Sequence, residues 1–377
     1  MIYFDNAATT FPKPNEVIRG MLECMKRYGG NPGRGAHPLA VAAAEAVFDT
    51  RSEIASFFSS SKPENVIFTL NATHALNTAI FGTVKQGDHI LISNLEHNSV
   101  LRPVAELYRQ GTASYSVFDA LQSDEETLEN IKKALRKNTR VIITAHASNV
   151  CPRLLPIEEI ARFCRSRGIC YIVDASQSAG IYDISMKCGI SILCAPGHKG
   201  LYGPQGSGFC LFADDFDFSR FKPLLYGGNG YNSAKTDMGT LPPEAFEAGT
   251  VAVPNIVGLR NGIRYIKKTG IERIARHEQA VSDRIFERLA NNKKIKLYMP
   301  KDRRGSVILF NAEGISGTNL SVLLAKHGIC TRSGLHCSPL AHESLGTGND
   351  AVRLSFSAFN TISEADEFCR ILESRPR

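Results

Sequence analysis

The strongest constraint on the fold is a repeated alternation of short and long apolar patterns that starts near residue 65. Short runs rich in β-branched and aromatic residues are followed by a polar or Gly break and then by a longer segment of helical period. This alternation predicts βαβ units, and hence an α/β domain with a seven-stranded, mainly parallel sheet. The expected strands are Val66–Thr69, His89–Ser93, Ser114–Phe118, Arg140–Thr144, Tyr171–Asp174, Ser191–Ala195 and Gly208–Phe212. The expected helices between them are Thr73–Phe81, Val100–Arg109, Thr127–Arg136 and Ile157–Arg167.

A smaller unit is expected at the C-terminal end. The Gly- and Pro-rich stretch Tyr226–Pro254 breaks the alternation, and one long helical pattern then runs from Asn255 to about Leu289. The segments expected after it are a strand near Gly305–Phe310, a helix near Leu320–Lys326, a strand near Val352–Ser355 and a last helix from Glu364. We therefore expect a large domain of residues 1–265 and a small α+β domain of residues 266–377. Residues 1–20 could pack back against the small domain.

Composition excludes several classes of protein. With 377 residues, of which 43% are hydrophobic and 21% charged, the chain can bury a sizeable core, which rules out disorder, collagen and a coiled coil. The net charge of +7 is modest, and the basic clusters at 293–296 and 301–304 are short. We interpret them as solvated turns rather than a nucleic-acid surface, so a small-molecule partner is expected.

No membrane or secretory segment is expected. The sequence has no run of about 18 apolar residues, and it opens without a basic region followed by an apolar one. The ten cysteines contain no C-x-x-C pair, so most should be reduced and buried, without a zinc site. These features predict a cytoplasmic protein that binds neither membranes nor a structural metal.

Polar residues follow directly after four of the predicted strands, where the ligands of open α/β sheets bind. Ala72 and Thr73 open a helix, so free N–H groups and a hydroxyl could hold a phosphate there. A plain helix cap is the alternative at this position. His97 follows the next strand and could stack on an aromatic cofactor or be a surface imidazole.

Asp174 and Lys199 follow two successive strands and could face the same crevice. A buried carboxylate needs a cationic partner, although Asp174 could also cap the next helix. A partly desolvated lysine forms Schiff bases, although Lys199 could also be a lysine whose long stem lies on the surface of a Gly-rich turn. Together the two residues could hold a protonated pyridine nitrogen and an aldehyde carbon, as pyridoxal phosphate (PLP) requires.

A fifth candidate site lies in the predicted small domain. Cys337 is flanked by polar and turn-forming residues, and a neighbouring imidazole or guanidinium would favour its thiolate. Arg353 lies on a short strand sixteen residues later and could bind a substrate carboxylate through two hydrogen bonds. Structural roles remain open for both residues.

These motifs together resemble those of the class V aminotransferase family, and most of all its cysteine desulfurase and selenocysteine lyase branch. Their order and approximate spacing match over nearly the whole chain. The matching motifs are Asp5-Asn6-Ala7-Ala8-Thr9-Thr10, Glu96-His97-Asn98, Ser148-Asn149-Val150, Asp174-Ala175-Ser176-Gln177, Gly197-His198-Lys199, Phe246-Glu247-Ala248-Gly249-Thr250 and Arg332-Ser333-Gly334-Leu335-His336-Cys337.

The resemblance implies a PLP-dependent fold of the aspartate-aminotransferase type that is active as a homodimer. It implies that Lys199 binds the cofactor covalently and later transfers protons. Asp174 is expected to pair with the pyridinium nitrogen, His97 to stack on the ring and Gln177 to hydrogen-bond the phenolic oxygen.

The resemblance also implies a phosphate site with one unusual position. Its ligands are expected to be Ala72, Thr73 and His198, together with Thr250 of the partner subunit. The branch usually has a Ser two residues before the His of its lysine motif, but this chain has Pro196, which offers neither a hydroxyl nor an N–H. Cofactor binding must therefore depend on the remaining donors.

For the substrate, the resemblance implies that Asn149, Arg353 and Arg332 bind the amino acid L-cysteine. Cys337 is expected to attack its sulfur, which leaves a persulfide on the enzyme and releases alanine. The sulfur would pass to an acceptor protein, as in sulfur mobilisation for iron–sulfur cluster assembly. Two further departures, an extra residue at Gly200 and Leu335 in place of a usual His, leave the substrate preference and the acceptor open.

Three functions are therefore compared. The first is a PLP-dependent cysteine desulfurase. The second keeps the cofactor but changes the chemistry, as in a selenocysteine lyase, an aminotransferase, an epimerase or another lyase of this fold. The third is a non-catalytic scaffold or phosphate-binding module. Release of alanine from cysteine or selenocysteine separates the first two, and a colourless protein would favour the third.

Overall fold

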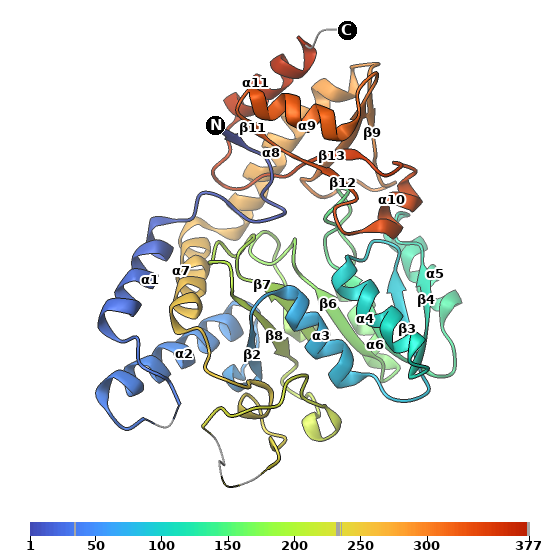
Figure 1. The fold of residues 1–377 in the computed structure, drawn as a ribbon. Coiled ribbons are helices and arrows are strands. Elements are labelled where there is room, and N and C mark those ends of the chain that lie inside the picture. The colour runs from blue at the N-terminus through green and yellow to red at the C-terminus, as the bar shows by residue number, and fades with distance from the viewer. Residues whose placement is uncertain (34, 231–233, 235, 375–377) are drawn as a thin grey trace.

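The predicted seven-stranded sheet is present in the structure, a computed structural model that describes residues 1–33, 35–230, 234 and 236–374. The strand order is β2-β8-β7-β6-β5-β3-β4, and β8 alone runs antiparallel to its neighbours. The strands are β2 Val66–Thr69, β3 Asp88–Ser93, β4 Ala113–Phe118, β5 Thr139–Ala145, β6 Cys170–Asp174, β7 Ile192–Pro196 and β8 Gly208–Phe212. The mainly parallel sheet expected from the sequence is thus confirmed (Figure 1).

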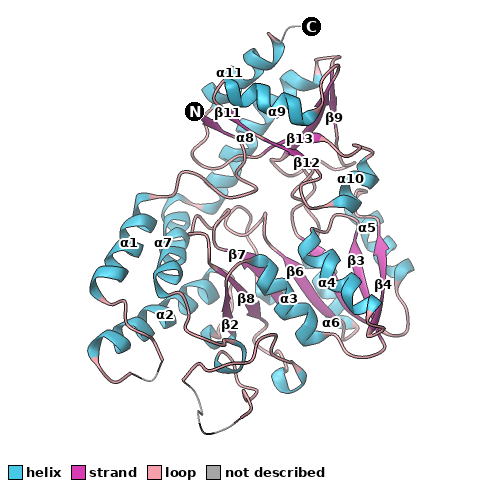
Figure 2. Ribbon diagram, viewed as in Figure 1, coloured by secondary structure: helices cyan, strands magenta, loops and turns pink. Residues whose placement is uncertain are grey.

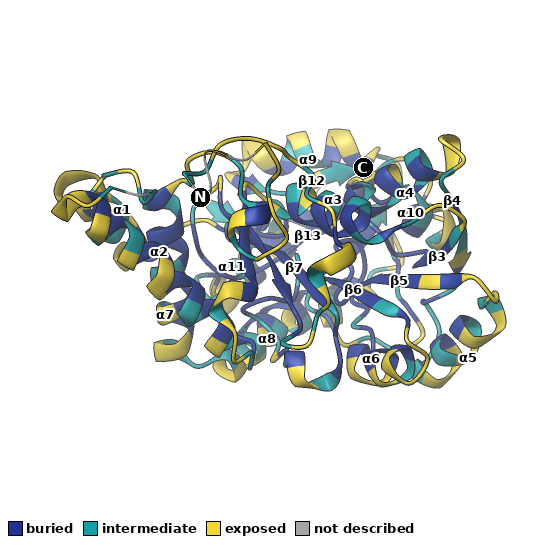
Figure 3. Ribbon diagram, turned by 90° about the horizontal axis from the view of Figure 1, so that it is seen from below, coloured by how far each residue is buried: buried dark blue, intermediate teal, exposed yellow. Residues whose placement is uncertain are grey.

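Helices cover both faces of this sheet (Figure 2). The helices that connect its strands are α3 Ala72–Thr83, α4 Asn98–Arg109, α5 Asp124–Ala134 and α6 Ile157–Ser166. Consecutive strand residues point to opposite faces, so Ile143 packs in the cluster with α3 and α4, whereas Ile142 packs in the cluster with α5 and α6. Burial on both faces explains why the strands are continuously apolar (Figure 3).

Two helices before the sheet were not predicted from the sequence. They are α1 Asn15–Arg27 and α2 Pro38–Phe57. The composition of this region, rich in Gly, Pro and Ala, concealed α2, which begins with Pro38 at its first position. The His37 side chain caps it by accepting a hydrogen bond from the backbone N–H of Ala40 at 3.3 Å.

The single long helix expected from Asn255 to about Leu289 is wrong. The structure has α7 Val253–Thr269 and α8 Ile271–Ala290, which are separated at Gly270. Gly270 has a φ of 91°, a conformation that side chains with a Cβ rarely adopt, so the helical pattern continues in the sequence while the helix itself ends. Within the stretch Tyr226–Pro254, residues 231–233 and 235 lie outside the described residues.

The C-terminal part forms an antiparallel sheet with the order β12-β13-β10-β9. Its elements are β9 Ile295–Leu297, β10 Ile308–Ala312, α9 Gly317–Lys326, β11 Ile329–Cys330, β12 Arg332–Gly334, α10 Pro339–Leu345, β13 Ala351–Leu354 and α11 Ile362–Glu373. The N-terminal strand β1, Ile2–Tyr3, pairs in parallel with β11, and Phe4 is fully buried in the core of this part. The start of the chain therefore packs against its end, while the boundary at residue 265 stays a prediction.

Arg153 joins the end of β5 to two distant segments. It is fully buried, donates to the carbonyl of Ala120 at 2.9 Å and forms ion pairs with Asp124 at 2.9 Å and Asp302 at 3.5 Å. Its backbone carbonyl accepts from the N–H of Ser148 at 3.0 Å, so Arg153 also closes the loop that carries Asn149.

We expect an Arg153→Met variant to lower the free energy of unfolding by about 3 kcal/mol, because the carbonyl of Ala120 and the hydroxyl of Thr127, both on buried residues, lose their donor. Urea unfolding of both cofactor-free proteins measures the change. The control is Arg162→Met on α6, whose ion pairs are at the surface, for which less than about 0.5 kcal/mol is expected. A loss below about 1 kcal/mol for Arg153→Met would contradict this structural role.

Candidate active site

One cavity of about 160 Å³ lies at the carboxyl ends of the central strands. Asp174 ends β6 and Lys199 follows β7, and these two strands pair in parallel with Asp174 opposite Cys194. Both side chains line the cavity, as the sequence predicted for residues at neighbouring strand ends. The predicted site residues in its wall are Ala72, Thr73, His97, Asn149, Asp174, Gln177, His198 and Lys199.

Thr250 does not line this cavity. It is exposed and lines a second cavity of about 830 Å³ beside α2. Glu247, three residues earlier in the chain, forms a buried ion pair with Arg51 at 2.6 Å and also accepts a hydrogen bond from the N–H of Phe68 at 2.6 Å. The ion pair fixes the chain before Thr250 to α2 and the hydrogen bond fixes it to β2, and the contact expected through a partner subunit stays a prediction.

Asp174 presents a carboxylate to the cavity although it is 4% exposed. Its Oδ1 accepts from the N–H of Ser176 at 2.9 Å, and no hydrogen bond within the described part of the chain uses its Oδ2. The helix cap considered from the sequence is wrong, because β6 is followed by a turn and not by a helix, and Oδ1 accepts its hydrogen bond within that turn. The second oxygen is available to a cationic group in the cavity.

The side chain of Lys199 lines the cavity from the turn that follows β7. Burial lowers the pKa of Lys199 to about 8, while Asp174 opposes and the Arg353 guanidinium reinforces this shift. The carbonyl of Lys199 accepts from the N–H of Tyr202 at 2.8 Å. An amine with such a pKa has a substantial neutral fraction near pH 7.5, which nucleophilic attack on a carbonyl carbon requires.

The carbonyl before Lys199 is bound by the N-terminal segment. The His198 carbonyl accepts from the N–H of Thr10 at 3.0 Å, the hydroxyl of Thr9 at 3.2 Å and the amine of Lys13 at 2.7 Å. Burial lowers the pKa of Lys13 to about 8. The sequence analysis did not single out Lys13, because its partner is a backbone atom 185 residues away.

His97 sits at the N-cap of α4 with its ring in the cavity wall. Its Nδ1 accepts from the N–H of Ser99 at 3.0 Å and lies 2.9 Å from the Ser99 hydroxyl. Burial lowers the pKa of His97, so the ring is neutral near pH 7. On the opposite side Gln177 donates its amide to the Ala7 carbonyl at 3.0 Å.

The start of α3 and His198 fit an anion such as a phosphate. Asn71 caps α3 by accepting from the N–H of His74 at 2.9 Å, whereas no hydrogen bond among the described residues uses the N–H of Ala72 or Thr73. Nδ1 of His198 is buried without a partner. Burial, reinforced by the charges of Lys199 and Lys13, lowers the pKa of His198 to about 4, so the ring is neutral. A phosphate could accept hydrogen bonds from these free N–H groups at the helix start and from the unpaired ring nitrogen beside them.

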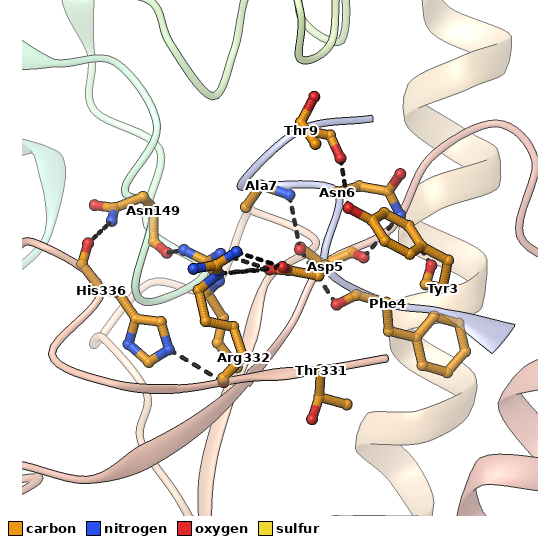
Figure 4. Close-up of polar contacts among 12 residues, drawn as sticks. Tyr3, Phe4, Asp5, Asn6, Ala7, Thr9, Asn149, Thr331, Arg332 and His336 are labelled. Carbon is orange, nitrogen blue, oxygen red and sulfur yellow. Dashed lines mark hydrogen bonds and ion pairs between the residues drawn. The ribbon is translucent and has the colours of Figure 1, made fainter. Parts of the chain in front are cut away.

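Asp5 joins the two arginines that were expected at the substrate, and Figure 4 shows its contact with Arg332. Its carboxylate accepts from Arg332 Nη2 at 2.8 Å and from Arg353 Nη2 at 3.1 Å. Arg353 also donates to the carbonyl of Asn149 at 3.0 Å, and its Nε is buried without a partner. Two guanidinium groups and one carboxylate leave a net positive charge, with free N–H groups for one more carboxylate.

Cys337 lies on a loop between β12 and α10, outside the cavity wall. All ten cysteines lie within the described residues and are free thiols, and among them Cys337 alone is exposed. His336 and Cys337 have φ values of 50° and 58°, so both adopt the left-handed conformation. Such strain persists only where surrounding contacts fix it.

Contacts from the large sheet hold the Cys337 loop in place. The N–H of Asn98 donates to the Cys337 carbonyl at 2.7 Å, and the amide of Asn149 donates to the His336 carbonyl at 2.8 Å. The Asn149 amide oxygen in turn accepts from Ser338 at 2.8 Å. The side chain of Asn149 is therefore engaged by this loop, which brings Cys337 to the edge of the site.

Among the described residues no cluster of three or more His, Cys, Asp or Glu side chains could hold a metal ion. Nor is any helix within those residues both long and apolar enough to cross a membrane.

Comparisons with known proteins identify the family of this chain. The model of the family described as Aminotransferase class-V matches residues 2–368. A probable cysteine desulfurase of Methanothermobacter thermautotrophicus is 31% identical and is covered over 94% of its length by 99% of this chain. One from Pyrococcus abyssi is 32% identical with the same coverage.

Solved structures of cysteine desulfurases are also similar to this chain. The apo structure of a cysteine desulfurase from Thermococcus onnurineus superposes with a TM-score of 0.89 at 32% identity, covering 99% of this chain and 94% of that one. The cysteine desulfurase CsdA of Escherichia coli has the same fold, with a TM-score of 0.86 at 22% identity over 98% of this chain and 93% of that one. With a family model that spans almost the entire sequence, the chain belongs to the class-V aminotransferase family.

Proposed function

We propose that this protein is a PLP-dependent cysteine desulfurase that converts L-cysteine to L-alanine and retains the sulfur as a persulfide on Cys337. The observation that carries the proposal is the single cavity into which neighbouring strand ends bring Asp174 and Lys199, below the loop that carries the exposed cysteine. A carboxylate and an amine of lowered pKa are the pair that PLP requires.

In this proposal, different cavity residues bind different parts of the cofactor. Asp174 Oδ2 would hold the ring nitrogen of PLP, and the neutral ring of His97 would stack on the cofactor. The N–H groups of Ala72 and Thr73 and Nδ1 of His198 would hold the PLP phosphate, and Thr250 of the partner subunit would complete the site in a homodimer. Bound PLP supplies an electron sink for the carbon atoms of the substrate.

The substrate is held by its carboxylate in this proposal. Arg353 offers a buried, unpaired Nε, and Arg332 and Asp5 set its position. Lys199 takes a proton from Cα of the amino acid and returns a proton at the end of the reaction. Asn149 lines the cavity and also holds the Cys337 loop, because its amide donates to the His336 carbonyl.

The sulfur transfer balances without an external oxidant or reductant. The thiolate of Cys337 forms an S–S bond with the sulfur of L-cysteine while the bond from that sulfur to Cβ breaks. The electron pair of the broken bond stays on Cβ and takes up a proton. Cysteine and one protein thiol thus yield alanine and one persulfide. An acceptor protein then takes the sulfur. We place the protein in the cytoplasm, where its ten free cysteines persist as thiols.

Incubation of the PLP-loaded protein with L-cysteine tests the proposal. A first fast turnover that releases about one alanine per chain is expected, because later turnovers wait until excess cysteine, itself a thiol, reduces the persulfide. Mass spectrometry after this first turnover should find one extra sulfur on the Cys337 peptide. Added dithiothreitol should release sulfide and restore continuous alanine production. Alanine release from selenocysteine alone, or conversion of cysteine to a keto acid, would replace this function by another of the same fold.

A further inference from the structure

Two hydroxyl groups from two different helices meet in the wall of the cavity. Thr73 lies in the first turn of α3 and Ser99 in the first turn of α4, and their hydroxyl oxygens are 2.7 Å apart. Ser99 is 7% exposed and lines the same cavity as Thr73 and His198. The sequence analysis singled out Thr73 but not Ser99.

We propose that the Ser99 hydroxyl is a phosphate ligand of this chain and replaces the donor that Pro196 cannot supply. The inference rests on the proposed function, since the anion concerned is the phosphate of PLP. Pro196 lines the same cavity and has neither a hydroxyl nor an N–H. Ser99 is the hydroxyl that lies directly against Thr73, at the end of the cavity with the free N–H groups of α3.

The hydrogen bonds around Ser99 allow its hydroxyl to turn toward an anion. The N–H of Ser99 already donates to Nδ1 of His97 at 3.0 Å, so this nitrogen keeps a donor without the hydroxyl. One hydrogen bond joins the hydroxyls of Ser99 and Thr73, and it uses one of their two protons. If both hydroxyls donate to phosphate oxygens instead, every group remains paired.

The backbone of α4 does not compete for the anion. The N–H of Asn98 donates to the Cys337 carbonyl, and those of Val100 and Leu101 donate to the His97 carbonyl at 2.9 and 3.1 Å. Ser99 therefore contributes a side chain only, and its removal should affect one hydrogen bond to a charged group. A loss of this kind weakens binding by roughly 10- to 100-fold.

The experiment titrates cofactor-free protein with PLP and with pyridoxal, which lacks the phosphate, and follows absorbance or fluorescence. Ser99→Ala should raise the Kd for PLP by roughly 10- to 100-fold and change that for pyridoxal by less than about twofold. Pro196→Ser added to Ser99→Ala should recover most of the lost affinity. Ser166→Ala, an exposed hydroxyl on α6, is the matched control and should change neither Kd.

The outcomes separate this inference from the proposed function. Equal weakening for PLP and pyridoxal in Ser99→Ala would mean that Ser99 acts through His97, and unchanged values would mean that it has no part in binding; either overturns the inference. A wild-type protein that does not prefer PLP to pyridoxal would overturn the proposed function instead.

Discussion

A Cys337→Ala variant is expected to release alanine from L-cysteine at least about 10³-fold more slowly than the wild type, because the reaction loses its sulfur nucleophile. Cys151 and Cys170 cannot replace it. Burial raises the pKa of Cys151 to about 11 and that of Cys170 to about 12, so both remain protonated thiols at neutral pH. The visible spectrum of bound PLP should not change, since Cys337 lies outside the cavity wall.

The matched control for this variant is Cys330→Ala. Cys330 is half-buried at the end of β11 and precedes Cys337 by seven residues, so its loss should leave the rate within about twofold of the wild type. Persulfide formation at a different cysteine, with alanine release intact in Cys337→Ala, would contradict the role given to this loop.

A Lys199→Ala variant is expected to lower the rate of alanine release by roughly 10³- to 10⁴-fold, because the group that transfers the substrate proton is lost. Lys199→Arg should be equally inactive, since guanidinium stays charged and cannot take up a proton. Both rates are measured with saturating PLP. The control is Lys62→Ala, at an exposed lysine beyond α2, which should behave as the wild type. Activity within tenfold of the wild type in Lys199→Ala would assign the proton transfer to another residue.

The pKa of Lys199 also predicts how the acetylation rate of its amine depends on pH. Below about pH 8 the amine is protonated, so its acetylation rate should rise about tenfold per pH unit, and above pH 8 it should level off. The acetylation rate of a free lysine, added to the same sample as a reference, should continue to rise toward pH 10. Competitive labelling of the cofactor-free protein with acetic anhydride, followed by mass spectrometry, measures both. A Lys199 profile that still rises between pH 9 and 10 would contradict the lowered pKa.

Local patterns were sufficient to predict the central sheet and one half of the site. Strands buried on both faces read as continuous apolar runs, and the parallel order then brings the residues after β6 and β7 together, as found for Asp174 and Lys199. The same reasoning located the start of α3. It failed at Gly270, where apolar periodicity continues across a helix break that only the backbone conformation reveals.

The other half of the site depends on contacts between residues far apart in the sequence. Asp5 is 327 residues from Arg332 and 348 from Arg353, and no pattern in either segment indicates their pairing. Ser99 was equally hidden, since a serine in the first turn of a helix has an ordinary structural explanation. Its significance arises only from the approach of two helix starts, which is a property of the tertiary structure.

The contacts of the N-terminal segment with the C-terminal strands determine the order in which parts of the protein can fold during synthesis. Asp5, Ala7 and Lys13 are synthesised first, yet the partners of Asp5 belong to the last strands of the chain. The central sheet can fold as it emerges, whereas the ion pair between Asp5 and Arg353 can form only after Arg353 has left the exit tunnel. A prematurely terminated chain therefore leaves Asp5 without this partner even when its sheet is complete, so this contact is among the last to form during synthesis.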